Sequence, residues 1–188
     1  VDFASASAHK FHGPKGVGFM FIRQPNQIEA IITGGSQERG NRSGTENLAS
    51  IVGMTKALEL ATSNIAHDID YLNHLRTHFI SKLKESFPSM SFLTEMDQSL
   101  CTIVSAVFPP EFESEMLLFQ LDMKGIACSG GSACSSGANK ASHVLAHFHL
   151  PEGSKVVRFS FSKFNKEKEI DFCIEGIKQI ASERGQNC

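Results

Sequence analysis

Several features that define whole classes of protein are missing from these 188 residues. The chain has no block of basic residues and a formal net charge of −2, so it lacks the surface that nucleic-acid binding favours. No apolar run approaches the roughly 20 residues that a membrane-spanning helix needs. We also expect no signal peptide, since none is recognisable ahead of the first motif. The hydrophobic fraction of 41% is that of an ordinary soluble globular protein with one or two domains.

Cysteine is too sparse and too scattered to form a disulfide framework. The five cysteines are Cys101, Cys128, Cys134, Cys173 and Cys188. An odd number spread over a chain of this size is not the pattern of a disulfide-stapled secreted domain. No Cys-x-x-Cys pair is present, so a thiolate zinc site is not expected. A reducing compartment fits better, and we predict a cytoplasmic protein.

The histidines do not form a metal-binding pattern either. His74 and His78 are four residues apart, which could place two ligands on one helix face. Because no third ligand lies nearby in the sequence, a solvated helix face is the favoured interpretation. His143, His147 and His149 lack acidic or thiolate partners at a fitting spacing. We therefore predict no metal.

The stretch richest in chemistry is Ser7-Ala8-His9-Lys10-Phe11-His12-Gly13-Pro14-Lys15-Gly16. The apolar run Val17–Ile22 follows it and predicts a strand. A lysine on a tight turn between strands can capture a carbonyl group, because burial and neighbouring groups can lower the pKa of an amine. From local chemistry alone, a solvated surface lysine beside a turn is the favoured interpretation.

A second loop, residues 34–47, combines four glycines, two arginines and several hydroxyl groups. Arginine side chains and exposed backbone N–H groups both favour phosphate or carboxylate. A surface loop held by arginine salt bridges explains the same composition equally well. The apolar pattern of residues 27–33 before it predicts a further short strand.

From Asn47 to Phe87 the apolar residues recur at helical spacing, and Pro88 ends this helical pattern. The polar triplet Thr62-Ser63-Asn64 predicts a bend between two helices. The expected apolar stripes are Ile51, Met54 and Leu58 in the first helix and Ile65, Ile69, Leu72, Leu75, Phe79 and Leu83 in the second.

The remaining elements alternate between strands and helices. In order, we predict a buried strand over 100–108, a mostly buried helix over 113–123, a short strand over 126–128, a helix over 140–148, a strand over 156–162, and a final helix that Asn165 caps and that runs to about Arg184. Gly125 is expected to end the helix over 113–123, because glycine is common just after a helix C-terminus. In the strand over 156–162, Arg158 is the one charged residue, and an internal salt bridge is its ordinary explanation.

A third loop is Ser129-Gly130-Gly131-Ser132-Ala133-Cys134-Ser135-Ser136-Gly137. A cysteine among glycines and serines is not in a core environment, and mobile loops carry reactive groups that must travel. The alternative is an incidental cysteine in a flexible linker. Cys128 fits the strand before the loop and is expected to be structural.

Four motifs, in this order along nearly the whole chain, resemble those of pyridoxal-phosphate (PLP) cysteine desulfurases. These enzymes form the NifS/IscS group of the class V aminotransferase superfamily. The motifs are Ser7-x-His9-Lys10-x-x-Gly13-Pro14-Lys15-Gly16, Gly34-Gly35-x-Gln37-Glu38 with Arg42-x-Gly44-Thr45-Glu46-Asn47, Ser129-Gly130 to Cys134-Ser135-Ser136, and Arg158-Phe159-Ser160. Together they are far more specific than any one motif.

The resemblance assigns cofactor roles to the first two motifs. It implies that Lys10 forms the Schiff base with PLP and that Ser7 and His9 bind the cofactor phosphate. Thr45 then reaches the PLP phosphate of the neighbouring subunit, which implies a homodimer.

The resemblance assigns the chemistry on the substrate to the last two motifs. Cys134 is the nucleophile that takes sulfur from L-cysteine, giving L-alanine and an enzyme persulfide, and Arg158 grips the substrate carboxylate. Lys10, freed from PLP, acts as the base at Cα. A sulfur-acceptor or iron–sulfur scaffold protein is the implied partner, with no nucleic acid and no membrane.

The implied fold is α/β, that of a fold-type I PLP-dependent transferase. Residues 1–61 are expected to be the C-terminal portion of the large PLP-binding domain, and residues 62–188 the small C-terminal domain. The chain starts at Val1 and has about half a desulfurase's length, so we expect it to be the C-terminal half of such an enzyme.

Two other functions stay open. One is a different enzyme of the superfamily, such as a selenocysteine lyase or an aminotransferase. The other is a non-catalytic half-enzyme that only dimerises or docks a partner, since the groups that hold the PLP ring in the family are absent. For this reason we expect the isolated chain to be inactive and to bind PLP weakly.

Overall fold

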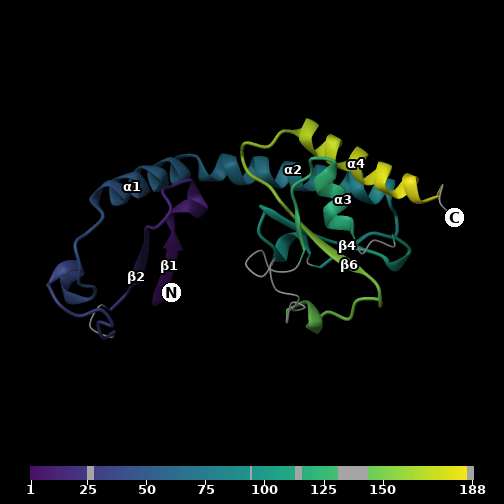
Figure 1. Cartoon of the computed structure of the whole chain (residues 1–188). Helices are drawn as coiled ribbons and strands as arrows, with labels where there is room; N and C mark the ends of the chain where they lie inside the picture. Colours follow the sequence, from purple (N-terminus) through teal and green to yellow (C-terminus); the bar gives the residue numbers. More distant parts are fainter. Residues whose placement is uncertain (25–27, 94, 113–115, 131–143, 186–188) are drawn as a thin grey trace. The chain divides into compact units, whose positions relative to one another are not determined.

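The chain forms two compact units, Val1–Ile65 and Ala66–Cys188. The structure is a computed structural model that describes residues 1–24, 28–93, 95–112, 116–130 and 144–185 (Figure 1). The sequence predicts a boundary between residues 61 and 62, and the division lies between Ile65 and Ala66. Below, each unit is described by itself.

The first unit is built on a β-hairpin. Strand β1, Phe3–Ser7, pairs antiparallel with β2, Gly18–Ile22, in the register Phe3↔Ile22 to Ser7↔Gly18 (Figure 1). The short 3-10 helix η1, Ala8–Phe11, follows β1 directly. The strand predicted around the lysine turn is therefore confirmed. The strand predicted over 27–33 is wrong for residues 28–33, which form bends and extended chain.

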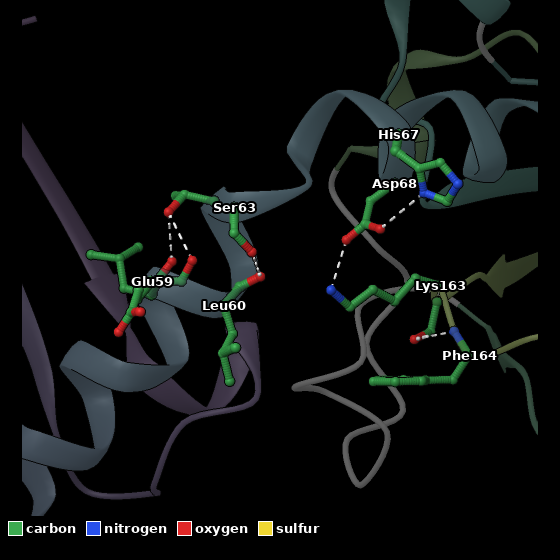
Figure 2. Close-up of polar contacts among 10 residues, drawn as sticks. Glu59, Leu60, Ser63, His67, Asp68, Lys163 and Phe164 are labelled. Atoms are coloured by element: carbon green, nitrogen blue, oxygen red, sulfur yellow. Dashed lines mark hydrogen bonds and ion pairs between the residues drawn. The ribbon is translucent and has the colours of Figure 1, made fainter.

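A glycine-rich loop and a helix complete this unit. The 3-10 segment η3, Gln37–Gly40, lies in the loop, and helix α1 spans Leu48–Ser63. The side chain of Asn47 caps α1 by accepting a hydrogen bond from the Ser50 N–H at 3.2 Å. At the other end, the Ser63 hydroxyl donates to the Leu60 carbonyl at 3.1 Å (Figure 2). Such hydroxyl bonds within a last turn favour a bend, and the predicted break occurs at Asn64.

Very little of the first unit is buried. Ala8 is the one buried hydrophobic residue among those described in Val1–Ile65, and α1 contains no buried residue. The predicted apolar stripe of α1 therefore packs into no core. The exposed large hydrophobic side chains of this unit include Phe3, Phe19, Met20, Phe21, Leu48, Val52, Leu58 and Leu60. A two-stranded hairpin alone is at best marginally stable in water, and the described part of this unit gains little from apolar burial of its own.

The second unit contains a four-stranded antiparallel sheet in the order β3-β4-β6-β5. The strands are β3, Ser91–Phe92; β4, Ile103–Phe108; β5, Ser129–Gly130; and β6, Lys155–Ser160. The strands predicted over 100–108 and 156–162 are confirmed as β4 and β6. The strand predicted over 126–128 is displaced, since the chain pairs with β6 at Ser129 and Gly130 instead.

One face of this sheet carries the core. Alternate residues of the two central strands, Val104, Ala106, Val157 and Phe159 among them, pack against helix α2, Ile65–Ser86, and helix α4, Glu167–Gly185 (Figure 1). The rings of Phe79 and Phe159 lie 4.8 Å apart in a tilted pair. The isoleucine stripe of α4, whose helical spacing predicts one buried face, is buried at all four positions: Ile170, Ile174, Ile177 and Ile180. None of the described helices is both long and apolar enough to cross a bilayer.

Helix α3, Leu117–Met123, corrects one expectation about burial. Leu117 and Leu121 enter the core, but Met116, Phe119 and Met123 are more than half exposed. The helix predicted over 113–123 is seen over Leu117–Met123, where it is buried on one face only, and residues 113–115 lie outside the described part of the chain. The helix predicted over 140–148 is seen as the 3-10 turn η7, Leu145–His147, while residues 140–143 lie outside the described part of the chain.

The start of α4 also differs from the prediction. Asn165 Oδ1 accepts from the Ser162 N–H at 2.8 Å, in the segment before the helix. The carboxylate of Glu169 accepts from the Lys166 N–H at 2.9 Å and from the Asn165 amide at 3.0 Å. The Asn165 amide and the Lys166 N–H lower the pKa of Glu169. The Asn165 side chain therefore caps no N–H group of α4, and Glu169 in the first turn instead accepts from Lys166, the residue before the helix.

A polar seam joins α2 to the start of α4. It consists of Lys163–Asp68 at 2.7 Å, Tyr71 Oη–Asn165 O at 2.7 Å, His74–Glu167 at 2.5 Å and His78–Asp171 at 3.0 Å. His74 is exposed, as expected of a solvated helix face, whereas His78 is half-buried, and both contact carboxylates of α4. Figure 2 shows Asp68 between His67 and Lys163, with the lysine bond the shorter.

Replacing Asp68 tests this seam. The hydrogen bond from Lys163 lowers the pKa of Asp68. A depressed carboxyl pKa stabilises the fold above the unfolded value of about 3.9 and loses that contribution as pH falls through the folded value. We expect Asp68→Asn to unfold at lower urea concentration at pH 7, measured by far-UV circular dichroism, and to match the parent chain near pH 3.

Asp70→Asn is the matched control, because Asp70 is an exposed carboxylate on the same helix. It should leave the urea midpoint unchanged at pH 7. A loss of stability in Asp68→Asn that persists undiminished at pH 3 would show that the ion pair is not its cause.

Candidate active site

The lysine turn is fixed at Ala8, which is completely buried. The Ala8 N–H donates to the Val17 carbonyl at 3.0 Å, and the Ala8 carbonyl accepts from the Gly13 N–H at 2.8 Å. His12, at φ 68°, adopts the left-handed conformation that closes the turn, and its N–H also points to the Ala8 carbonyl. The Ala8 N–H thus ties the turn to the residue before its return strand, and the Ala8 carbonyl closes the turn itself.

Close contact with α1 explains why the turn contains Gly13 and Pro14. A Cβ added to Gly13 would lie 2.9 Å from the Ala8 Cβ and 3.3 Å from the Ala57 Cβ of α1. On the helix side, a Cβ added to Gly53 would lie 2.9 Å from Pro14 Cγ. A glycine inside a helix costs about 1 kcal/mol relative to alanine. The close contact with Pro14 explains why a glycine occupies position 53 despite this cost. The turn rests directly on the backbone of α1.

The three side chains that the sequence singles out on this turn are all exposed. Ser7 ends β1 in an extended conformation, and His9 and Lys10 lie in η1. Within the described residues, no ion pair or hydrogen bond occupies these three side chains. They offer an amine, a hydroxyl and an imidazole on one rigid turn. That donor set fits the aldehyde and phosphate ends of PLP.

Thr45 lies on the loop that leads into α1. The buried Ser43 organises this loop: its hydroxyl donates to the Gly35 carbonyl at 2.6 Å, and its N–H to the Ile32 carbonyl at 3.1 Å. The Gly44 N–H donates to the Gln37 side chain at 3.2 Å. Thr45, which follows, is exposed. Sequence reasoning missed Ser43, because a serine in a polar loop gives no signal of burial.

The same loop contains local backbone strain. Glu38 and Arg39 both have positive φ, at 48° and 58°, a region that costs a residue with a side chain about 1–2 kcal/mol. Within the described residues, no hydrogen bond or ion pair joins Thr45 to the lysine turn. The structure thus groups Ser7, His9 and Lys10 on one turn and places Thr45 on another segment of the same unit.

Arg158 lies in the central strand β6 of the second unit and is partly buried. Its Nε is buried without a hydrogen-bond partner. Of the salt bridges between described residues, none includes Arg158. The internal salt bridge that would explain a strand arginine is therefore not present in this part of the chain, and the guanidinium is available for an anion.

Cys134 lies outside the described residues, so its environment is not part of the site geometry. Two other cysteines can be assessed. Burial and the charge of Asp122 raise the pKa of Cys128 to about 11, and burial followed by the proximity of Cys128 raises the pKa of Cys173 to about 12. Both are protonated near neutral pH and are poor nucleophiles.

Lys10 is exposed on a glycine–proline turn, and Arg158 has no ion-pair partner among the described residues, so the donor set suits a lysine-linked PLP enzyme with an α/β fold. The aminotransferase class-V family matches residues 1–172. The chain belongs to this family, whose members depend on PLP.

Curated relatives give the same result over nearly the whole chain. It is 39% identical to a cysteine desulfurase of Klebsiella pneumoniae, over 96% of this chain and 45% of the relative. It is 40% identical to the cysteine desulfurase IscS of Clostridium botulinum strain Hall, over 98% of this chain and 47% of the relative. The chain thus spans about half the length of the curated relatives it matches.

Solved structures agree with the predicted fold class. A NifS-like protein at 35% identity gives a TM-score of 0.82 over 97% of this chain and 46% of that chain. A NifS-like protein from Rickettsia africae, at 28% identity, gives a TM-score of 0.81 over 97% of this chain and 48% of that chain. The predicted family and the α/β fold of fold-type I PLP enzymes are confirmed.

The contact of the lysine turn with α1 can be tested at Gly53. We expect Gly53→Ala to push Pro14 away and loosen the turn, although alanine favours the helix. Hydrogen–deuterium exchange read by mass spectrometry should show faster exchange at the Ala8 and Gly13 amides. Thr55→Ala, an exposed change on the same helix, is the control. Unchanged protection of both amides in Gly53→Ala would show that this contact does not hold the turn.

The assignment of reactive and structural thiols can be tested by alkylation. With iodoacetamide near pH 7.5, we expect Cys134 to be modified first, and Cys128 and Cys173 much more slowly, because their raised pKa values keep them protonated. Peptide mass spectrometry gives the rate at each position, and unfolding in urea should make the rates similar. Cys128 reacting as fast as Cys134 in the native chain would contradict the assignment.

Proposed function

We propose that this chain is part of a cysteine desulfurase that removes sulfur from L-cysteine and gives L-alanine and a persulfide on Cys134. The observation that carries the proposal is the match to cysteine desulfurases at 39–40% identity over 96–98% of the chain. The exposed Lys10 turn and the unpaired Arg158 are consistent with it.

On the first unit, Lys10 would hold PLP through its amine, with the Ser7 hydroxyl and the His9 imidazole on the phosphate. Thr45 would contact the phosphate bound to the neighbouring subunit of a homodimer. The cofactor supplies an electron sink for the carbanion formed at Cα of the substrate. The Lys10 amine would take the Cα proton, which requires it to be neutral at that moment.

On the second unit, Arg158 would bind the substrate carboxylate with two parallel hydrogen bonds. The Cys134 thiolate would attack the substrate sulfur. The Sγ–Cβ bond breaks, its electron pair stays with the carbon side, and Cβ then takes a proton to give alanine. The sulfur stays on Cys134 as a persulfide until an iron–sulfur scaffold or another acceptor in the cytoplasm takes it.

The activity would require protein beyond this chain. The chain covers less than half of the relatives' length, and the described part of its first unit buries one hydrophobic residue. The apolar faces of the hairpin and α1 would be covered by the rest of the large domain, which would also hold the PLP ring. The isolated chain should therefore bind PLP weakly and be inactive.

Substitution at Cys134 separates a desulfurase from its rivals. In the chain assembled with a complementary large-domain segment, Cys134→Ala should abolish alanine and sulfide release from L-cysteine and keep the PLP absorbance. Lys10→Ala should lose both. A selenocysteine lyase or an aminotransferase would keep its own activity in Cys134→Ala.

Cys101→Ala serves as the control, since Cys101 is a half-buried cysteine outside the Lys10 and Cys134 motifs. It should behave as the parent protein does. Full desulfuration by Cys134→Ala would contradict the proposed nucleophile.

A further inference from the structure

Arg158 lies in a row of three side chains across the second unit's sheet. The register pairs Arg158 of β6 with Ser105 of β4 on one side and with Ser129 of β5 on the other. Residues directly opposite each other in antiparallel strands point to the same face, with Cβ atoms about 4.5–5.5 Å apart. The arginine is therefore flanked on both sides by a short hydroxyl side chain.

This row lies on the sheet face away from the helical core. Residues that alternate with the row, Val104, Ala106, Val157 and Phe159, belong to the core cluster. Gly130 also faces that side, since it pairs with Val157 of the core cluster. Ser105, Arg158 and Ser129 are each partly buried on the opposite face.

The row leaves hydrogen-bonding capacity unused. Arg158 Nε is buried and unpartnered, and in the part of the chain that is described neither serine hydroxyl makes a hydrogen bond. A buried donor without an acceptor destabilises the folded protein. An acceptor that reaches Nε would remove this cost. Serine is small enough to leave space beside the guanidinium, and its hydroxyl can donate to an anion or accept from arginine.

We infer that Ser105 and Ser129 are positioning residues that hold the Arg158 guanidinium for side-on binding of the substrate carboxylate. This inference deepens the proposed function and rests on it. One carboxylate oxygen accepts from Nε–H and the other from the adjacent Nη–H, the two-bond geometry of arginine–carboxylate pairs. The serine hydroxyls meet the remaining donors of arginine and the remaining lone pairs of the carboxylate.

The test uses this chain assembled with a complementary large-domain segment and PLP, and measures protection of Arg158 against phenylglyoxal by peptide mass spectrometry. L-Alanine is the carboxylate probe, and L-alaninamide is its match without the carboxylate. We expect L-alanine, but not L-alaninamide, to slow modification of Arg158. Modification of Arg23, which lies in the first unit, should respond to neither.

Serine variants then isolate the positioning role. Ser105→Ala and Ser129→Ala should each need about tenfold more L-alanine for the same protection, the effect of losing one hydrogen bond to a charged group. Ser105→Thr and Ser129→Thr keep the hydroxyl, so they should be protected at the same L-alanine concentration as the parent protein. Ser91→Ala is the control, because Ser91 pairs with Val107 on the same sheet face, away from Arg158.

The outcomes separate this inference from the function on which it rests. Equal protection in the parent chain and both alanine variants overturns the positioning role and leaves Arg158 as the carboxylate anchor. No protection of Arg158 by L-alanine in the parent chain contradicts the anchor itself, and the positioning role with it. Equal protection by L-alaninamide would show that the carboxylate is not the group recognised.

Discussion

The close approach of two backbones is the constraint on which the candidate cofactor site depends. The lysine turn can lie on α1 only because Gly13 and Gly53 carry no side chains where Ala8, Ala57 and Pro14 come close. Buried Ala8 then holds the turn through both of its backbone groups, since its N–H donates to the Val17 carbonyl and its carbonyl accepts from the Gly13 N–H. Lys10 is thereby presented from a fixed base with its amine exposed, which is what attachment of a cofactor requires of the protein.

The two units are stabilised in different ways. The second unit has its own core of sheet, α2 and α4, and a polar seam that fixes the start of α4. The described part of the first unit exposes apolar side chains on its hairpin and on α1. Arg158 thus lies on a self-supporting scaffold, whereas Lys10 lies on a unit that needs more protein around it. This difference accounts physically for the expectation that the chain alone binds PLP weakly.

Much of the fold could be predicted from local pattern. The break at Asn64, strands β4 and β6 and the isoleucine stripe of α4 follow from periodicity and from hydroxyl or proline signals. The exposed face of α3 and the missing strand at 28–33 could not, because apolar pattern does not say which neighbours are present. The roles of Lys10 and Arg158 came from motif resemblance, while Ser43, Gly53 and the serines beside Arg158 needed three-dimensional contacts and strand register.

Native mass spectrometry with PLP tests the central claim most directly, that this chain supplies one part of a PLP desulfurase. The purified chain would be measured after desalting, alone and together with a complementary large-domain segment. The account predicts no retained PLP on the chain alone, and a dimeric assembly of both polypeptides with PLP when they are combined. PLP retained by the chain alone, or an assembly of both polypeptides that never takes up PLP, would contradict it.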